Sequence, residues 1–241
     1  MSITTQTRVA TLVPDWLKPY LRPAHRWATA QQRQWNSRRH RKSRAEIHSY
    51  WEHPWDGVNQ PESYASEEGR ARSEFLVSLL RQYATPESNI LEVGCNVGRN
   101  LHYLFASGFH HLTGIEISED AVKAGGRIYP DMQECVKIIN APAEDALPRL
   151  LDNSYDVVFT MAVLQHIHPD SEAVFAEIAR AARRHLVTVE NEVSTTWRHF
   201  PRNYQGVFCR LGLAQVHEAE RLPGLPASYV ARVFVKGGLC S

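Results

Sequence analysis

The chain has 241 residues, of which 43% are hydrophobic and 22% charged. This composition is close to that of soluble globular proteins and excludes collagen-like, disordered and disulfide-dependent mini-protein classes. The net charge of +1 hides a division, because residues 1–50 carry ten basic and two acidic side chains, a net +8, whereas the other 191 carry seventeen basic and twenty-four acidic, a net −7.

Residues 1–64 are predicted to form a basic, Trp-rich N-terminal extension. Prolines 14, 19 and 23 interrupt any early helix, and a basic run covers residues 38–42. Residues 48–64 combine aromatic residues, prolines and an Asp-Gly pair, which predicts an ordered loop. We expect this extension to act as a lid or as a contact in a homo-oligomer.

The rest of the chain, residues 65–241, is predicted to be one α/β domain. An amphipathic helix is expected from the N-cap Ser66 onward, followed by apolar, β-branched runs that alternate with helical segments near 99–107, 119–128, 144–150, 171–183 and 199–211. A Pro- and Gly-rich connection joins the last two runs and is too short for a crossover helix. We therefore predict a Rossmann-like, doubly wound seven-stranded sheet with one antiparallel strand, its strands at residues 89–93, 112–116, 135–139, 155–159, 186–189, 214–218 and 229–235.

The segment ILEVGCNVGRN, residues 90–100, is the most informative part of the sequence. It predicts a buried strand, then a tight turn at Gly94 and Gly98, then a helix that begins near Arg99. Ligands of open α/β sheets bind beyond the carboxyl ends of the strands, where helix amides meet polar ligand atoms. Glu116 ends the next strand, 22 residues after Gly94, where a carboxylate can accept hydrogen bonds from a ribose diol.

The spacing of this segment favours one nucleotide ligand over another. A dinucleotide fingerprint is G-x-G-x-x-G around a pyrophosphate, whereas here Glu92 precedes the first glycine by two residues and suits a cationic group. The segment resembles the first motif of the class I S-adenosylmethionine-dependent methyltransferases, E/D-x-G-x-G-x-G. Asn96 stands in place of the usual middle glycine, and Asn is a residue that tolerates a left-handed backbone and can add a side-chain hydrogen bond.

The resemblance extends over about residues 66–235 and implies S-adenosylmethionine as cofactor. Glu116 in TGIEISEDAV corresponds to the ribose-binding acid, NAPAEDALP to the segment at the adenine edge, and DNSYDVVFTMAVLQHI to the fourth-strand motif. Lead-in residues of the family often close over the cofactor. The residues implied to bind it are Tyr64, Arg72, which would pair with its carboxylate, Glu92, Gly94, Asn96, Gly98, Glu116, Ile117, Ala143, Glu144 and Met161.

Methyl transfer to a hydroxyl requires close positioning and a group that removes a proton. His166 follows the fourth strand, on the turn that faces the methyl group in related enzymes, and is the predicted base; ordering of the loop is its alternative role. Glu190 and Glu192 end the fifth strand and are expected at the same rim, where a carboxylate could orient His166 or bind substrate hydroxyls. Glu144, His166 and Glu192 could also bind magnesium.

Three functions are compatible with the sequence. The first is O-methylation of a saccharide or another small molecule, with Trp51 and Trp55 stacking on sugar rings. The second is methylation of RNA, with Arg38, Arg39, Arg41 and Arg44 gripping phosphates, although the body is acidic and no RNA-binding module is recognised. The third is a non-catalytic scaffold whose N-terminal arm docks on an anionic membrane.

We expect a cytoplasmic protein without a transmembrane segment. No window approaches eighteen consecutive apolar residues, and the first sixteen residues lack the basic and apolar regions of a signal peptide.

Overall fold

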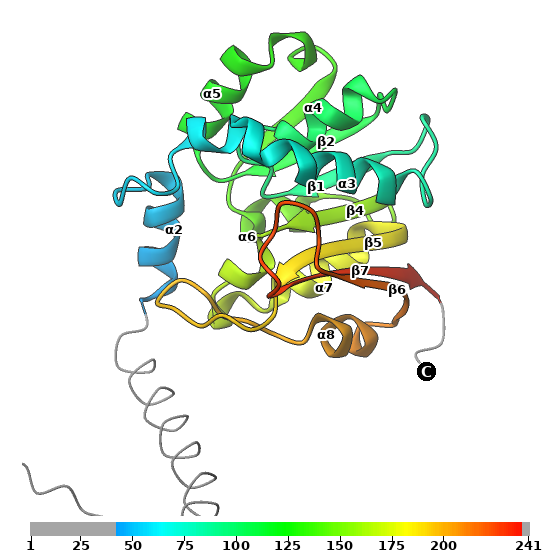
Figure 1. Cartoon of the computed structure of the whole chain (residues 1–241). Coiled ribbons are helices and arrows are strands. Elements are labelled where there is room, and N and C mark those ends of the chain that lie inside the picture. Colours follow the sequence, from blue (N-terminus) through cyan, green and yellow to red (C-terminus); the bar gives the residue numbers. More distant parts are fainter. Residues whose placement is uncertain (1–41, 238–241) are drawn as a thin grey trace, which may run out of the picture. The chain divides into compact units, whose positions relative to one another are not determined.

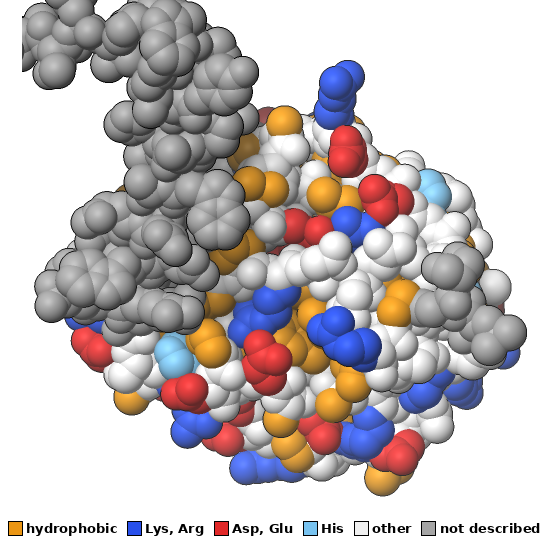
Figure 2. All heavy atoms as spheres, turned by 90° about the horizontal axis from the view of Figure 1, so that it is seen from below, with side chains coloured by type: hydrophobic (Ala, Val, Ile, Leu, Met, Phe, Trp, Pro, Cys, Tyr) orange, Lys and Arg blue, Asp and Glu red, His pale blue; other side chains and the backbone are white. Residues whose placement is uncertain are grey.

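The computed structural model describes residues 42–237, which belong to one compact unit that is separate from residues 1–41. The predicted phosphate-gripping residues Arg38, Arg39 and Arg41 lie outside the described residues. Within residues 42–237, no helix is long and apolar enough to cross a bilayer. On the face shown in Figure 2, basic and acidic side chains are interspersed around the uncovered surface and do not form one extended patch of a single charge.

A seven-stranded sheet forms the centre of the described unit, in the order β3-β2-β1-β4-β5-β7-β6 (Figure 1). Strands β1 to β5 are parallel, and β7 runs antiparallel to both β5 and β6. The predicted fold class and its single reversed strand are therefore confirmed. The strands are β1 (Ile90–Val93), β2 (Leu112–Glu116), β3 (Val136–Asn140), β4 (Tyr155–Met161), β5 (Ala182–Asn191), β6 (Leu213–Glu220) and β7 (Tyr229–Lys236).

Helices cover both faces of the sheet, which is why the central strands are apolar without alternation. One core cluster packs α3 (Arg70–Leu80) and α4 (Arg99–Ala106) on the sheet, and a second packs α6 (Ala143–Ala146), α7 (Ala173–Ala181) and α8 (Tyr204–Arg210) on the other face (Figure 1). Helix α5 (Glu119–Ile128) follows β2. Residues on β4 alternate between the clusters, with Val157 and Phe159 in the first and Val158 in the second.

Residues 44–52 form a helix, α2 (Arg44–Glu52), where the sequence analysis expected a surface extension that leads into a loop. Ser43 and Glu46 form a capping box in which each side chain bonds the other residue's backbone N–H. Ile47 and Tyr50 are buried. The prediction of a loop from residue 48 is therefore wrong for the first part of that segment, because the capping box of Ser43 and Glu46 starts a helix that runs to Glu52.

Two predicted helix starts also differ from the structure. Ser66 makes no capping hydrogen bond, since residues 67–69 form a short 3-10 turn and the α-helix starts only at Arg70. The helix expected from residue 199 begins at Tyr204, after Asn203, whose side chain accepts a hydrogen bond from the Gly206 N–H. The helix expected at 144–150 is one short α-turn followed by a 3-10 turn that contains Pro148.

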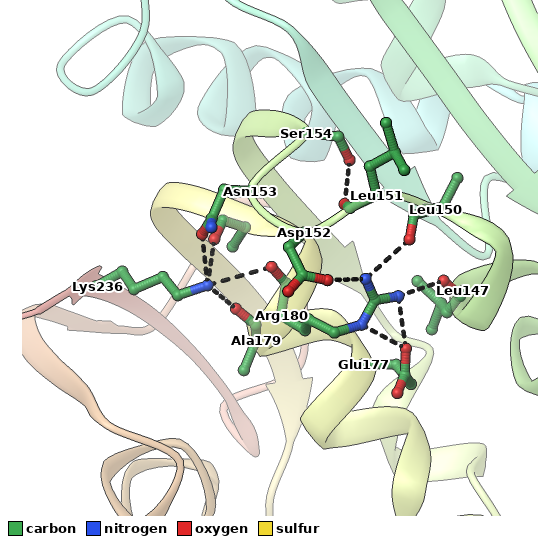
Figure 3. Close-up of polar contacts among 11 residues, drawn as sticks. Leu147, Leu150, Leu151, Asp152, Asn153, Ser154, Glu177, Ala179, Arg180 and Lys236 are labelled. Atoms are coloured by element: carbon green, nitrogen blue, oxygen red, sulfur yellow. Dashed lines mark hydrogen bonds and ion pairs between the residues drawn. The ribbon is translucent and has the colours of Figure 1, made fainter.

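The amino ends of β4 and β5 and the carboxyl end of β7 meet at one edge of the sheet, which we call the anchor edge (Figure 3). Lys236 Nζ donates to Asn153 Oδ1 and to the carbonyls of Ala179 and Ala182, at 2.8–2.9 Å. Arg180 bonds the carbonyls of Leu147 and Leu150 and the carboxylates of Asp152 and Glu177. These contacts fix the end of α7 and the turn before β4.

Candidate functional site

A cavity of about 420 Å³ lies beyond the carboxyl ends of β1, β2 and β4, at the edge opposite the anchor edge. Its volume is in the range of small-molecule sites. Residues of α2, of the turn after β1 and of the loop after β5 contribute to its wall. The sequence-predicted residues that line it are Tyr64, Arg72, Glu92, Gly94, Asn96, Glu116, Ile117, Ala143, Glu144, Met161 and His166.

The turn after β1 brings backbone against the cavity. Gly94 has φ +74°, and a Cβ at this position would lie 2.4 Å from Cγ2 of Val163. Asn96 has φ +49°, and its Oδ1 accepts a hydrogen bond from the Val97 N–H at 2.8 Å, as expected for the residue that replaces glycine. Gly98, with φ +77°, precedes the first residue of α4 and is not among the residues that line the cavity, so its contact with the cofactor stays a prediction.

Glu92 is a buried carboxylate that is only half satisfied. Oε1 accepts a hydrogen bond from Asn100 Nδ2 at 2.7 Å, and Asn100 in turn accepts one from Ser73 Oγ at 2.8 Å. Oε2 is enclosed and has no partner within residues 42–237. Burial raises the pKa of Glu92 to about 8. An ammonium group would satisfy this oxygen and favour its charged form, so the residue fits the cationic end of S-adenosylmethionine.

Glu116 closes another side of the cavity at the end of β2. Its two carboxylate oxygens accept hydrogen bonds from the backbone amides of Asn96, at 2.8 Å, and Ser118, at 2.9 Å. Burial raises its pKa, which these amides partly offset. A carboxylate oxygen accepts more than one hydrogen bond, so the fixed carboxylate can still accept hydrogen bonds from a ribose diol.

Glu144 forms an ion pair that the sequence analysis did not expect. Its Oε1 lies 2.9 Å from Nε2 of His48 on α2, so the pair ties α2 to α6 at the cavity. Although burial alone raises the pKa of Glu144, the hydrogen bond with His48 lowers it to about 2. Glu144 therefore does not join His166 and Glu192 in the magnesium site considered above. No cluster of three or more metal-binding side chains occurs in the described chain.

The predicted contact between a β5 carboxylate and His166 is not formed. Glu190 is fully buried and accepts hydrogen bonds from the backbone amides of Val163 and Gln165, so it holds the turn after β4 in place. Glu192 forms a two-point ion pair with Arg232 on β7. Neither carboxylate lines the cavity.

His166 lines the cavity, but both of its ring nitrogens have partners. Nδ1 lies 2.8 Å from the Arg198 carbonyl, which can only accept, so Nδ1 carries the proton. Nε2 then accepts from the Gln165 amide at 3.2 Å, and that amide is oriented because its Oε1 accepts from the Asn191 N–H. Burial and the neighbouring His199 lower the pKa of His166 to about 3. The sequence-predicted base therefore has no free lone pair in this structure.

Several residues at the same end of the cavity were not predicted as part of the cofactor or catalytic site. Trp51 lies against His166, with ring centroids 4.5 Å apart, and its buried Nε1 has no partner in the described residues. The Arg198 guanidinium lies over the rings of Tyr50, Trp51 and Trp197. Trp51 was predicted only as a sugar-stacking residue, and Arg198 and His199 follow no motif because they come from the irregular loop after β5. Trp55, the other predicted stacking residue, is 61% exposed and does not line the cavity.

Tyr64 and Arg72 lie on the wall formed by the segment before β1. Tyr64 donates from its hydroxyl to Asn59 Oδ1, and its carbonyl accepts from Arg99. Arg72 uses Nε to bond the Gly224 carbonyl at 2.6 Å. Its two Nη groups make no hydrogen bond within residues 42–237, so they are available to a ligand carboxylate.

Comparison with protein families matches residues 91–185 to a family model described as a methyltransferase domain. The matched range begins in β1 and ends in β5 and so contains the turn after β1, Glu116 and His166. No curated protein matches the chain.

Solved structures show the same fold. PH0226 from Pyrococcus horikoshii OT3 is 20% identical with a TM-score of 0.58, and the alignment covers 71% of this chain and 92% of that one. A chain of the Haloferax volcanii complex between a methyltransferase activator and a putative methyltransferase is 15% identical with a TM-score of 0.62. The alignment covers 82% of this chain and 100% of that one. Magnesium protoporphyrin IX methyltransferase from Synechocystis PCC 6803, with bound S-adenosylhomocysteine, is 16% identical with a TM-score of 0.61. The alignment covers 80% of this chain and 100% of that one.

Residues 91–185 therefore match a methyltransferase domain, and the described chain has the Rossmann-like fold of the methyltransferases compared.

Proposed function

We propose that this chain is an S-adenosylmethionine-dependent methyltransferase that methylates a hydroxyl group of a small molecule, such as a saccharide, and that a histidine takes the hydroxyl proton. The observation that carries the proposal is the composition of the cavity wall around His166. There an indole, two imidazoles, a phenol and an amide surround the cavity, from Trp51, His166, His199, Tyr229 and Gln165. Such groups bind neutral, hydroxyl-bearing ligands by stacking and hydrogen bonds.

Other residues of the cavity wall would bind the methyl donor. Glu92 would hold the ammonium group, Arg72 the carboxylate and Glu116 the ribose, while Ile117 and Ala143 would lie beside the adenine. Bound there, S-adenosylmethionine supplies an electrophilic methyl group. The protein then has to align the acceptor oxygen in line with the bond that breaks and to exclude water.

The wall formed by α2 favours a small acceptor over RNA. Ile47, His48 and Trp51 line the cavity from α2, and the His48–Glu144 pair holds that helix against α6. Because α2 borders the cavity on this side, it restricts the room for a large acceptor beside the cofactor. Of the four arginines predicted to grip phosphates, Arg44 is the one within the described chain; it is exposed on α2 and does not line the cavity.

The experiment that tests the proposal supplies S-adenosylmethionine with a ¹³C-labelled methyl group to the full-length chain, together with a small-molecule extract, glycans or RNA. We expect label in the small-molecule or glycan fraction, with the ¹³C chemical shift of an O-methyl group. Label found only in RNA, or only on nitrogen, would overturn the proposal. The Gly94→Ala variant is the control for transfer that does not depend on the cavity.

A further inference from the structure

His199 lies beside His166, but the ring nitrogens of the two residues make different hydrogen bonds. It belongs to the loop between β5 and α8 and lines the cavity. Its ring centroid is 4.6 Å from that of His166, and its side chain is half-buried. The two imidazoles therefore border the same part of the cavity.

The hydrogen bonds of the two rings are what separate them. Nδ1 of His199 lies 2.6 Å from Thr196 Oγ1, whereas Nε2 makes no hydrogen bond with the described residues. With its proton on Nδ1, shared with Thr196, neutral His199 presents a free lone pair at Nε2. His166 has no such atom, because Gln165 occupies its Nε2 and the Arg198 carbonyl its Nδ1.

We propose that His199, rather than His166, is the proton acceptor of the methyl-transfer reaction. This inference rests on the proposed O-methylation. As the bond between the acceptor oxygen and the methyl carbon forms, the carbon–sulfur bond breaks and its electron pair stays on sulfur. The hydroxyl proton moves to Nε2 of His199, so the positive charge lost from sulfur appears on the imidazolium. After turnover the imidazolium releases this proton to water.

Thr196 completes the arrangement that a histidine base requires. Once Nε2 has taken a proton, Nδ1 must donate, and Thr196 Oγ1 is the acceptor in contact with it. The charged group near the ring is Arg198, directly before His199 in the chain. The other titratable group is His166, whose ring is in contact with that of His199 and which its hydrogen bonds keep neutral. Burial and the Arg198 charge lower the pKa of His199, which keeps it neutral and able to accept a proton near pH 7.

His166 is then a positioning residue. Its Nδ1–H donates to the carbonyl of Arg198, the residue directly before His199. This bond fixes the loop backbone at the point where His199 enters the cavity. Replacing His166 should therefore reduce turnover through the loop geometry, without removing the group that accepts the proton.

Ring ¹⁵N NMR of the histidine-labelled chain, saturated with S-adenosylhomocysteine, tests the chemical states directly. The His199→Gln and His166→Gln variants assign the two signals. We expect neutral His199 to carry its proton on Nδ1 and to become protonated as the pH falls, while His166 keeps a single tautomer from pH 6 to pH 9. A proton on Nε2 of neutral His199, or a free and titrating Nε2 on His166, would overturn the assignment.

Kinetics test the role in turnover, with the small-molecule fraction that the wild type methylates as acceptor. We expect His199→Gln to lose at least about 100-fold in kcat while its affinity for S-adenosylhomocysteine stays within twofold. Thr196→Val should lose about tenfold, the value of one hydrogen bond, and Thr196→Ser should restore it. His217→Gln, at a half-buried position of β6 that does not line the cavity, is the matched control and should behave as wild type.

The outcomes distinguish this inference from the function on which it rests. If the wild type methylates a small-molecule hydroxyl and His199→Gln keeps full turnover, the assignment of His199 is wrong while O-methylation stands. A larger loss in His166→Gln than in His199→Gln, with unchanged S-adenosylhomocysteine affinity, also contradicts it. If the wild type methylates no small molecule, O-methylation itself fails, and the assignment fails with it.

Discussion

The two edges of the central sheet use similar polar groups in opposite ways. At the anchor edge, the Arg180 guanidinium contacts two carbonyls and two carboxylates, and Lys236 Nζ is surrounded by oxygen atoms (Figure 3). At the cavity edge, Glu92 Oε2, Trp51 Nε1 and Arg198 Nε are enclosed without a partner in the described residues.

Unpaired buried polar atoms cost free energy, so the difference indicates what each edge is for. The anchor edge gains stability from the hydrogen bonds and ion pairs of Arg180 and Lys236. The cavity edge keeps groups whose partners arrive with a ligand, and the left-handed backbone of Ala162, at φ +59°, adds strain there. Substitutions at the first edge should therefore change stability, and substitutions at the second should change binding.

The largest expected effect on binding is that of Gly94→Ala. The new Cβ would lie 2.4 Å from Val163 while the backbone keeps φ +74°. Affinity for tritiated S-adenosylmethionine, measured by equilibrium dialysis, should fall at least about 100-fold. Gly108→Ala is the matched control, because Gly108 also has positive φ, at +93°, but open space around its Cβ position. Equal affinities in the two variants would show that the turn after β1 is not the binding surface.

At the anchor edge, Arg180→Ala should lower the free energy of unfolding by about 2–3 kcal/mol, because carbonyl and carboxylate groups lose a charged donor. Urea denaturation measures this change. Affinity for S-adenosylhomocysteine should stay within twofold. The exposed Arg149, in the turn that Arg180 fixes, is the control. A variant that folds normally yet loses affinity would break the division between the two edges.

Glu92→Gln should change how stability depends on pH. Burial raises the pKa of this carboxyl to about 8 in the folded chain, above its unfolded value. Between these two pKa values the folded state keeps the carboxyl protonated, whereas the unfolded state has lost the proton. Stability of the ligand-free wild type should then fall as the pH rises toward 8. We expect the wild type to lose about 2 kcal/mol relative to Glu92→Gln between pH 6 and pH 9. The unfolding free energies are measured by urea denaturation. The same difference between wild type and Glu92→Gln at both pH values would contradict a buried carboxyl that lacks a partner charge.

The smallest expected effect is that of the pair between His48 and Glu144, which joins α2 to the cavity wall. The Glu144 carboxylate raises the pKa of His48, so the coupling is complete at low pH and disappears as the pH rises through the folded value. A double-mutant cycle with His48→Gln and Glu144→Gln should give about 0.5–1 kcal/mol at pH 6 and less at pH 9. The exposed pair of His53 and Asp120 should give no coupling free energy. Equal coupling free energies for both pairs would contradict a stabilising contact between His48 and Glu144.

The parts that the sequence predicted well are those that local spacing determines. The strand–turn–helix segment around Gly94 and the left-handed Asn96 depend on residues within a few positions, and so does the alternation that specifies the sheet. Helix boundaries were less accurate, because capping competes with other local hydrogen bonds. Ser43 with Glu46 makes a capping box, whereas Ser66 makes no cap.

The substrate end of the site could not be predicted in the same way. Whether His166 has a free nitrogen depends on Arg198, 32 residues later, and on Gln165, whose orientation depends on Asn191. Glu190 and Glu192 reach the expected rim of the sheet, but their side chains bond loop amides and Arg232. Such choices are made by tertiary contacts between distant segments, and no motif records them.

Calorimetric titration of the wild-type chain with S-adenosylhomocysteine tests most directly whether the unpaired groups at the cavity edge form a binding site. The account predicts one bound molecule per chain, with proton release below pH 8 as Glu92 becomes charged and with loss of that release in Glu92→Gln. Absence of binding, or binding with the same proton release in both proteins, would contradict it.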